Sequence, residues 1–467
     1  MRDHSNHIQL TREQAVEQML ARLGDGFGWG DVAADGPQDA ESHRREVGRK
    51  LAETVPVADA VDRVLAYDVR AQCDVPSCLT CGMDSIAVHW RDFEGLEPGA
   101  LPDTSGWVRG VDWEFANTGV AMPEGFDAAI VVEHVRVACD EQHVSIDAAP
   151  SRRFAGTRPA GGQMKRLDVI AEAGSLVTAD LAARIASGNN AVVPVVRKPR
   201  VAFIPTGNEL VPPGVPFNPD KPQAFAARGK NFETNSILVR AKVEAWGGEF
   251  VPFDIVRDAR DAIRQAIERA CEMADIVVLN AGSSKGSDDW SCEVMEELGD
   301  IICHQTNHGP GHHSSYALVD GVPIVGISGP SGGASFTLNF YLRPLMRMFL
   351  GLEPEVPRIP ARLAAPFPQG GPGSAPKPEP GEPLPGEARP LEHPPARAAS
   401  AGPGEPEFFG VKMLSLSVGA DGVLEATPLA GRPGSVETRA ANAYYLLPSG
   451  PGIEPPAVGD VIEVELR

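Results

Sequence analysis

Two short segments of the chain combine glycine, hydroxyl and carboxylate residues in a way that suits ligand chemistry. The first is Thr206-Gly207-Asn208-Glu209, and the second, 280–289, reads Asn-Ala-Gly-Ser-Ser-Lys-Gly-Ser-Asp-Asp. Glycine lets backbone N–H groups approach an anion closely, and carboxylates are the ligands that a hard cation takes. Taken singly, each segment also fits a tight turn with capping residues. Together they predict an anion site with a cation beside it.

Both segments follow apolar runs that are typical of buried strands, within a region (196–352) where strand and helix patterns alternate. The expected strands are 199–207, 251–256, 275–280 and 322–328, and the expected helices are 235–248, 258–274 and 289–299. This alternation predicts an open parallel α/β sheet. Ligands of such sheets bind in the loops at the carboxyl ends of the strands, which is where both glycine-containing segments lie.

The remainder of the chain divides by composition. Periodic apolar residues predict helices over 11–24 and 59–69, and short runs broken by Gly and Pro predict a β-rich module between about 72 and 165. Residues 366–407 are so rich in Pro and Gly that we expect an extended linker. Alternating runs in 408–467 then predict a small β-domain.

Bulk properties limit the partners and the compartment. The chain has 467 residues, a formal net charge of −21 and seven cysteines. Its length predicts several domains, and its charge argues against nucleic acid as a partner because phosphate backbones would be repelled. The first residues lack the apolar region of a signal peptide, and no stretch approaches the roughly 20 apolar residues of a membrane span. We therefore expect a cytoplasmic protein with reduced thiols and no membrane association.

Several separated motifs, in order along the chain, resemble those of the molybdopterin molybdotransferase family, which includes bacterial MoeA and the gephyrin E domain. Thr206 to Leu210 resembles the family's Thr-Gly-Asp-Glu-Leu loop, and 280–289 resembles its Ser-Gly-Gly-Val-Ser-Val-Gly loop with a trailing Asp. Met83-Asp84-Ser85-Ile86-Ala87 is similar to the family's Met-Asp-Gly-Tyr-Ala. Thr118-Gly119 and the residues up to Glu133 resemble its Thr-Gly-Ala-x-x-Pro-x-Gly-x-Asp stretch.

The resemblance implies a multidomain α/β plus β architecture. An elongated N-terminal domain would comprise 1–75 with 166–195, and a β-rich domain, 76–165, would be inserted between these halves. An open parallel α/β molybdopterin-binding domain would follow at 196–352. The Pro/Gly-rich linker would then span 353–407, ahead of the C-terminal β-domain at 408–467.

The resemblance also implies a reaction and its residues. Family members insert molybdate into adenylylated molybdopterin with hydrolysis of the adenylate, assisted by Mg²⁺, and they act as homodimers. A molybdopterin adenylyltransferase and molybdoenzyme acceptors are implied as further partners. The carboxylates that match family groups near the cation and the phosphates are Glu209, Asp258 and Asp289. Asp84 and Thr118 match groups that face the cleft from the partner subunit. The implied ligand-binding residues are Thr206, Gly207, Asn235, Gly282, Ser284, Gly286 and His312.

The departures from the family lie in the site loops. The family's Lys-Pro-Gly-Lys-Pro loop reads Gly-Pro-Gly-His-His at 309–313, so both lysines are missing, and Asn208 replaces an Asp. These changes motivate an alternative function, that of a molybdopterin-binding carrier or accessory protein without turnover. Another alternative is an α/β-hydrolase, because 282–286 is formally Gly-x-Ser-x-Gly around Ser284.

Two groups of residues have the types that ligate metals. The histidine group His304, His308, His312 and His313 either binds a metal or has a neutral or anion-contacting role. The cysteine group Cys73, Cys78 and Cys81 has part of an iron–sulfur spacing, but no fourth ligand follows. Buried thiols are the preferred interpretation of the cysteine group.

Overall fold

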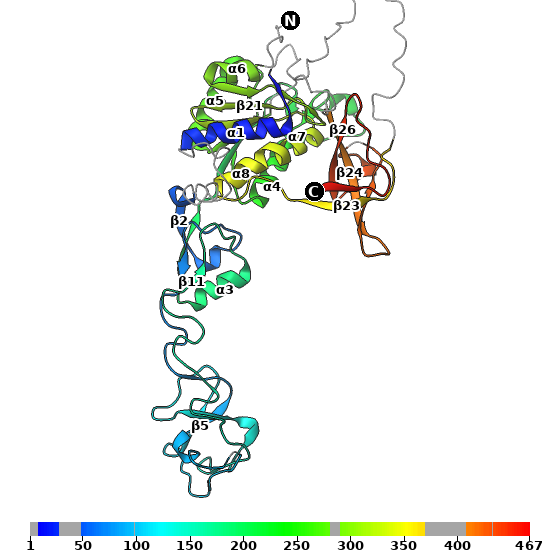
Figure 1. Cartoon of the computed structure of the whole chain (residues 1–467). Coiled ribbons are helices and arrows are strands. Elements are labelled where there is room, and N and C mark those ends of the chain that lie inside the picture. Colours follow the sequence, from blue (N-terminus) through cyan, green and yellow to red (C-terminus); the bar gives the residue numbers. More distant parts are fainter. Residues whose placement is uncertain (1–7, 28–47, 98, 281–289, 369–407, 432) are drawn as a thin grey trace, which may run out of the picture. The chain divides into compact units, whose positions relative to one another are not determined.

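A computed structural model describes residues 8–27, 48–97, 99–280, 290–368, 408–431 and 433–467 (Figure 1). The chain forms two compact units: one comprises residues 48–196, and the other comprises residues 1–47 together with 197–467. Among the described residues, no helix combines the length and apolar character that crossing a membrane requires.

The larger unit contains a six-stranded sheet in the order β16-β13-β17-β22-β21-β18. The four parallel strands are β13 (Arg200–Ile204), β16 (Glu249–Pro252), β17 (Ile276–Leu279) and β22 (Val322–Gly326). This confirms the predicted parallel α/β core. The strand β21 (Ser315–Val319) pairs antiparallel with both β22 and β18 (Asp300–Cys303), so β21 alone runs opposite to the rest of the sheet. Neither β18 nor β21 was predicted. Asp320 and Gly321 join β21 to β22 with φ of 50° and 80°, as a two-residue hairpin turn requires.

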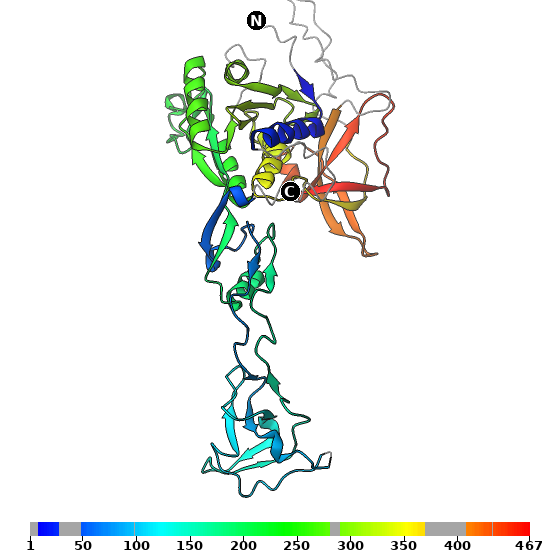
Figure 2. The same ribbon diagram turned by 60° about the vertical axis from the view of Figure 1, so that its left-hand side comes forward.

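Helices cover both faces of this sheet. On one face, α5 (Arg260–Met273) and α6 (Ser291–Leu298) bury residues such as Ile267 and Met295 against alternate strand residues such as Ile204 and Leu279. The helices of the other face are α4 (Asn235–Ala245), α7 (Ser331–Thr337), the π-helix η5 (Leu338–Leu342) and α8 (Arg343–Phe349) (Figures 1 and 2). The strand expected within 199–207 and the helices expected within 235–248, 258–274 and 289–299 thus correspond to β13, α4, α5 and α6.

The N-terminal helix α1 (Arg12–Phe27) forms where the sequence predicts a helix, but it belongs to the larger unit. Its buried face of Ala15, Met19 and Leu23 packs toward β18, β22 and η5. The expected assignment of residues 1–75 to one N-terminal domain is therefore wrong for α1, because its apolar stripe is buried elsewhere. The short strand β1 (Gln9–Leu10) also pairs with β19 (Gln305–Thr306) in the larger unit.

The C-terminal sheet has the order β20-β24-β25-β23-β27-β26 and closes on itself through β24 and β26. Its strands are β20 (His308–Gly309), β23 (Arg358–Leu363), β24 (Phe408–Val418), β25 (Leu424–Pro428), β26 (Ala443–Ser449) and β27 (Val461–Leu466). Residues 358–363 were expected in the linker that begins at 353. That boundary is wrong, because β23 forms a full antiparallel ladder with β27. Residues 369–407 lie outside the described residues.

The smaller unit has two hydrophobic regions. In the first, β2 (Ala52–Pro56) pairs with β12 (Val192–Val196), β3 (Val69–Arg70) pairs with β11 (Val169–Ala171), and α3 (Ala179–Ser187) packs against them. The second is the predicted β-rich module. There β5 (Ser85–Val88) lies between β6 (Trp113–Ala116) and β7 (Ala128–Val131), around a core that includes Trp113. Shorter pairs are β4 (Thr80–Cys81) with β10 (Thr157–Arg158), and β8 (Val135–Val137) with β9 (Val144–Ile146).

The helix expected over 59–69 is absent from the structure. Only a 3-10 turn, η1 (Val57–Asp59), forms there, and the chain then extends so that Val64 and Leu65 make bridges to Leu176 and Val195. Asp62 has a φ of 63°, which interrupts a right-handed helix. The apolar spacing that resembled a helix face instead supplies buried residues to the core beside α3.

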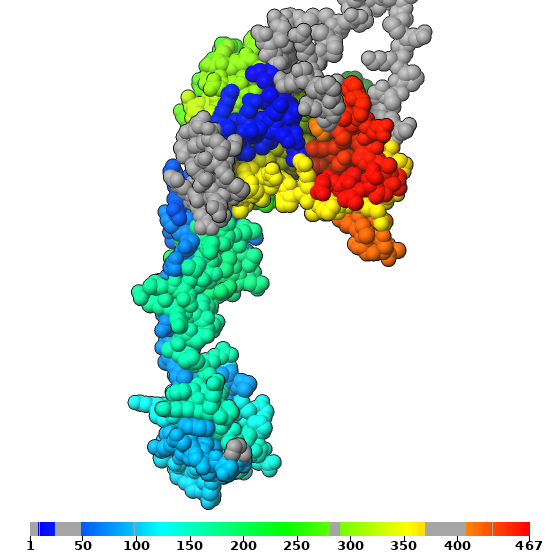
Figure 3. Space-filling model, in the orientation of Figure 1, coloured from blue at the N-terminus to red at the C-terminus, as the bar shows by residue number. Residues whose placement is uncertain are grey.

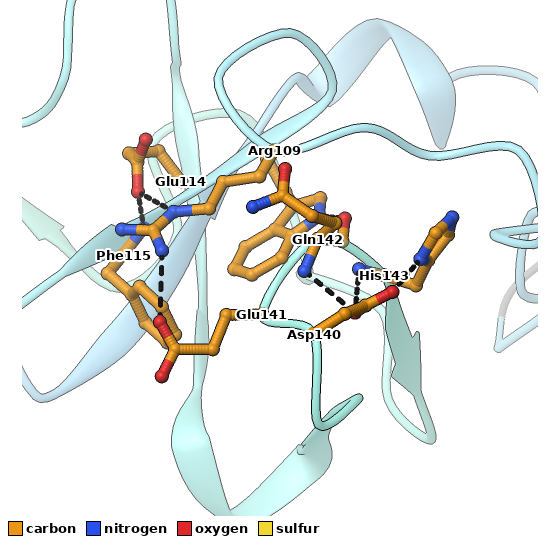
Figure 4. A network of polar contacts seen from close by, with 8 residues as sticks. Arg109, Glu114, Phe115, Asp140, Glu141, Gln142 and His143 are labelled. Atoms are coloured by element: carbon orange, nitrogen blue, oxygen red, sulfur yellow. Dashed lines mark hydrogen bonds and ion pairs between the residues drawn. The ribbon is translucent and has the colours of Figure 1, made fainter.

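Polar contacts stabilise the turn between β8 and β9 (Figure 4). Asp140 accepts hydrogen bonds from the backbone N–H groups of Gln142 at 2.9 Å and His143 at 3.4 Å, and from the His143 ring at 2.8 Å. Arg109 donates to Glu114 at 2.8 Å and to Glu141 at 3.4 Å, which connects this turn to the start of β6.

Candidate functional site

The candidate site lies at the carboxyl ends of β13 and β17. The chain leaves β13 to form β16 on one side of it and later returns to form β17 on the other side. This reversal of strand order is the position at which α/β sheets bind ligands. Thr206 and Asn280, the residues just beyond these two strands, are both buried. The Thr206 hydroxyl donates to the Asn280 carbonyl at 2.5 Å, and the Asn280 amide donates to the Thr206 carbonyl at 3.3 Å.

Asn235, the first residue of α4, joins this pair to a third loop. Its side-chain amide donates to the Asn280 side-chain oxygen and to the Gly329 carbonyl, both at 2.9 Å. The Asn235 side-chain oxygen and the Ser328 hydroxyl are buried and have no hydrogen-bond partner among the described residues. Buried polar groups are normally satisfied, so these two groups have hydrogen-bonding capacity that a ligand could use.

A fourth loop, 309–313, packs against the loop that begins at Ser328. A Cβ placed on Gly311 would meet the Gly333 carbonyl at 3.2 Å and the Thr337 hydroxyl at 3.1 Å. Ser314 closes the contact, because its hydroxyl lies 2.5 Å from the Gly311 carbonyl and 2.7 Å from the Thr337 hydroxyl. His312 follows Gly311 and is exposed. The loop 309–313, which lacks the two lysines of the corresponding family loop, thus packs against the other loops of the site.

Two predicted carboxylates flank Asn208. The Asn208 backbone N–H donates to Asp258 at 2.9 Å, and the Asp258 N–H donates back to the Asn208 side-chain oxygen at 3.3 Å. Glu209 is exposed, and its carboxylate oxygens would lie 2.9 and 3.0 Å from a Cβ on Gly207. The Lys230 ammonium donates to the Asn208 carbonyl at 2.9 Å and brings a positively charged side chain to this loop. The loop therefore presents carboxylate oxygens beside Thr206 and Gly207.

Asp84 and Thr118 lie together in the smaller unit. One Asp84 oxygen accepts from the Thr118 N–H at 2.8 Å and from its hydroxyl at 2.9 Å. These two bonds lower the pKa of Asp84, the backbone bond more than the hydroxyl bond. The predicted residues are thus brought together as two groups, one in each unit. Four predicted residues, Gly282, Ser284, Gly286 and Asp289, lie outside the described residues.

The histidine group is divided among separate contacts. His304 accepts from the Ile8 N–H at 3.0 Å and lies 2.7 Å from Glu296, whereas His308 is fully buried with its Nε2 2.8 Å from the Tyr341 hydroxyl. Burial lowers the pKa of His308 to about 3, with Arg12 contributing, so this imidazole is neutral. The described residues contain no group of three or more side chains placed to hold a metal ion. Of the three clustered cysteines, Cys81 is buried, Cys73 is partly buried and Cys78 is exposed, so the expectation of buried thiols is confirmed for Cys81 and wrong for Cys78.

Comparison with known protein families gives two matches, which together cover most of the chain. The family described as "MoeA N-terminal region (domain I and II)" matches residues 16–188. The family described as "Probable molybdopterin binding domain" matches residues 202–348, which contain all the strand-end loops of the candidate site. The chain belongs to the MoeA family.

Relatives and solved structures agree with this membership in the MoeA family. Molybdopterin molybdenumtransferase 2 of Mycobacterium tuberculosis is 27% identical over 354 residues, which cover 70% of this chain and 84% of the relative. The molybdopterin molybdenumtransferase of Bacillus subtilis is 26% identical over 316 residues, covering 64% and 70%. The MoeA protein of Pyrococcus horikoshii superposes with a TM-score of 0.63 at 21% identity, covering 91% of this chain and 98% of that protein. This superposition confirms the fold.

Three residues of this MoeA-family site were not among the predicted site residues. Asn280 connects Thr206 to Asn235, and Ser328 and Gly329 form the loop that Asn235 holds. Asn280 had a sequence signal, because it is the first polar residue after the apolar run Ile-Val-Val-Leu. Ser328 is the last residue of the expected strand 322–328, and Gly329 follows it. The rule that ligands bind after parallel strands would have selected all three.

Proposed function

We propose that this chain inserts molybdenum into molybdopterin during molybdenum cofactor biosynthesis, with adenylylated molybdopterin and molybdate as substrates and hydrolysis of the adenylate. The observation that carries the proposal is the buried contact of Thr206, Asn280 and Asn235 at the point where the strand order reverses. It lies within the part of the chain that matches a molybdopterin-binding family. The named relatives are molybdopterin molybdenumtransferases, which makes transfer the preferred activity.

The described residues suit a polar, planar ligand. The unpartnered oxygen of Asn235 accepts an N–H, which a pterin ring offers, and the Ser328 hydroxyl both donates and accepts. Gly329 leaves room above this position, since a Cβ there would meet no atom within 4 Å.

The loop around Asn208 fits Mg²⁺. The ion takes oxygen ligands and commonly binds through one or two carboxylates while keeping several waters. Glu209 and Asp258 supply two carboxylates on either side of Asn208, and the proposal includes Asp289 as a third. Bound there, Mg²⁺ would offset the charge of the phosphates. The Asn208 N–H holds Asp258 in place, and Gly207 gives the Glu209 carboxylate the space it occupies.

Turnover separates this proposal from the carrier alternative. The purified chain is incubated with adenylylated molybdopterin, Mg²⁺ and molybdate, and release of AMP is followed together with activation of a molybdenum-free molybdoenzyme. We expect AMP release that requires both Mg²⁺ and molybdate. Tight binding of molybdopterin without AMP release would instead identify a carrier.

Two variants test the assignment of the cation site. Asp289→Asn keeps the size of the side chain and removes its charge, and loss of one such contact typically costs about 3–4 kcal/mol in the transition state, or a hundredfold or more in rate. His312→Asn should cost less and should flatten the pH dependence near neutrality, because an imidazole loses its charge there. Full turnover by Asp289→Asn would contradict a cation site that includes the Asp289 carboxylate.

We further propose that the active form is a homodimer. The family resemblance supports this, because it assigns Asp84 and Thr118 to the site from the partner subunit. A molybdopterin adenylyltransferase and molybdoenzymes are the proposed suppliers and acceptors. Light scattering should give about twice the mass of the chain, which is 49.5 kDa. A monomer at micromolar concentration would contradict the proposal.

A further inference from the structure

Three cationic side chains gather where α4 meets the start of α8 and the final residue of the sequence. Lys242 and Arg343 both face the ring of Trp246, with the ammonium 5.1 Å and the guanidinium carbon 5.7 Å from the ring centroid. The third is Arg467, whose charge acts on Lys242 and whose backbone N–H donates to the Asn442 carbonyl at 2.9 Å. Both ribbon views place the C-terminus beside these helices (Figures 1 and 2).

In the part of the chain that the structure describes, no Asp or Glu side chain pairs with this cationic cluster, Lys242, Arg343 and Arg467. None of its three members forms an ion pair there, whereas Arg240 on the same helix pairs with Glu244 at 3.1 Å. The pKa of Lys242 is lowered to about 8, first by burial and then by the charges of Arg343 and Arg467. Uncompensated like charges are costly, and they are unexpected in a chain with a net charge of −21.

The cluster has the geometry of a built site. The Lys242 ammonium donates to the Asn339 side-chain oxygen at 2.7 Å, which fixes its position and leaves two of its three N–H donors available. Asn339 is itself buried and also contacts the Tyr444 hydroxyl, which donates to Glu465. The guanidinium of Arg343 lies near the same Trp246 ring, so two different kinds of donor lie close to one side chain.

We propose that Lys242, Arg343 and Arg467 form a binding site for a small tetrahedral oxyanion, of which phosphate, sulfate and molybdate are representatives. The site is separate from the strand-end loops. Lys242 lies seven residues along α4 from Asn235, which corresponds to about 10 Å along the helix. Through Asn339, Tyr444 and Glu465 the oxyanion stabilises the contact between the α/β sheet and the C-terminal sheet.

The test uses the full chain and inorganic phosphate at constant ionic strength, with chloride as the balancing anion. Thermal unfolding and tryptophan fluorescence are recorded during the titration, and Trp246→Phe identifies the contribution of this ring among the six tryptophans. We expect a saturable rise in Tm and a fluorescence change that is lost in Trp246→Phe. Lys242→Met and Arg467→Met should each weaken the apparent affinity at least tenfold. Arg240→Met, which removes a paired cation from the same helix, should leave it unchanged.

Parallel titrations distinguish the members of the ligand class. Similar affinities for phosphate, sulfate and molybdate support a general oxyanion site, and a marked preference for molybdate supports a site for that substrate. A response equal to that of chloride would overturn the proposal. So would an unchanged phosphate response in both Lys242→Met and Arg467→Met. Arg467 is exposed, so its variant retains the fold if the Lys242 variant does not. Glu209→Gln should still bind phosphate, which separates this site from the proposed transfer activity.

Discussion

The side-chain amide of Asn235 donates to the side-chain oxygen of Asn280 at 2.9 Å, which ties the first turn of α4 to the end of β17. Both side chains are buried, and both belong to the candidate site. The bond therefore contributes to stability and to the shape of the site at the same time.

Replacing Asn235 by Ala should affect both properties. The change leaves the Asn280 oxygen and the Gly329 carbonyl without their donor, and a buried group left unsatisfied typically costs about 1–3 kcal/mol. We expect chemical denaturation to show a loss of this size and molybdopterin binding to weaken as well. Ile237→Ala is the control, because Ile237 lies on the same helix with 61% of its surface exposed. Equal effects of the two substitutions would contradict a specific role for Asn235.

Gly207→Ala should displace Glu209. A Cβ at this position would lie 2.7 Å from Leu210 Cγ and 2.9 Å from a Glu209 oxygen, and the φ of 151° is unfavourable for alanine. We expect a stability loss of about 1–3 kcal/mol and a higher Mg²⁺ requirement for turnover. Gly214→Ala is matched to it, since Gly214 has a φ of 95° but nothing within 4 Å of its Cβ position. This control should lose stability only, and a change in its Mg²⁺ requirement would argue against displacement of Glu209.

Thr118→Val should move the titration of Asp84. The substitution removes the hydroxyl bond but keeps the backbone bond, so the lowered pKa of Asp84 should rise part of the way toward its usual value. Thr118→Ser should preserve the lowered pKa. A carboxyl whose pKa falls on folding stabilises the fold above its unfolded pKa, and this contribution disappears as the pH falls through the folded pKa. Carboxyl-carbon NMR titration measures the shift, and identical curves for the Val and Ser variants would contradict this assignment.

The buried pair of Arg12 and Glu465 should be sensitive to loss of one partner. Burial alone would raise the pKa of Glu465, but Arg12, at 2.8 Å, and the Tyr444 hydroxyl lower it overall. Arg12→Met leaves a buried carboxylate without its main counter-charge, which typically costs about 3–5 kcal/mol. The double variant Arg12→Met, Glu465→Gln should recover part of this loss. Denaturant unfolding of the two single variants and the double variant checks this, and strict additivity would contradict direct coupling.

Lys242 should destabilise the fold at neutral pH when no oxyanion is bound. Its pKa of about 8 in the folded protein lies below the usual 10.5, so the unfolded chain binds more protons between these values. Stability should therefore rise as the pH increases from about 8 to 10.5. Lys242→Met should add up to about 3 kcal/mol at pH 7, reduced by loss of the bond to Asn339. The difference between the variant and the parent should shrink as the pH rises, and a constant difference would contradict a lowered pKa.

The parts of the fold that the sequence predicted were those where local pattern and tertiary contact agree. The apolar run before Asn280 and the periodic face of 258–274 fit only one kind of element each. The expected helix over 59–69 failed because an αL residue, Asp62, redirects apolar residues whose spacing resembles a helix. Residues 358–363 were assigned to the linker because they precede the Pro-rich segment, and only pairing with β27 reveals them as a strand.

The candidate site was predictable at the level of loops rather than of contacts. Glycine and polar residues after strands located Thr206 and Gly207, since topology alone puts such residues at one edge of the sheet. That Asn235 bonds across to Asn280 depends on how α4 packs, and no local pattern encodes that distance. The cationic cluster was equally invisible, because Lys242, Arg343 and Arg467 are far apart in the sequence.

Strand β20 limits how the C-terminal sheet can be exchanged between proteins. His308 and Gly309 come from the middle of the α/β region, yet they pair in parallel with Phe409 and Gly410 of β24. Figure 3 shows the same unit, with α1 in dark blue and the last strands in red. A recombinant that carried 353–467 alone would expose this edge of β24 as unpaired backbone, which favours association with other chains. A domain graft that transfers the α/β region and the C-terminal sheet together should therefore be more soluble than one that separates them.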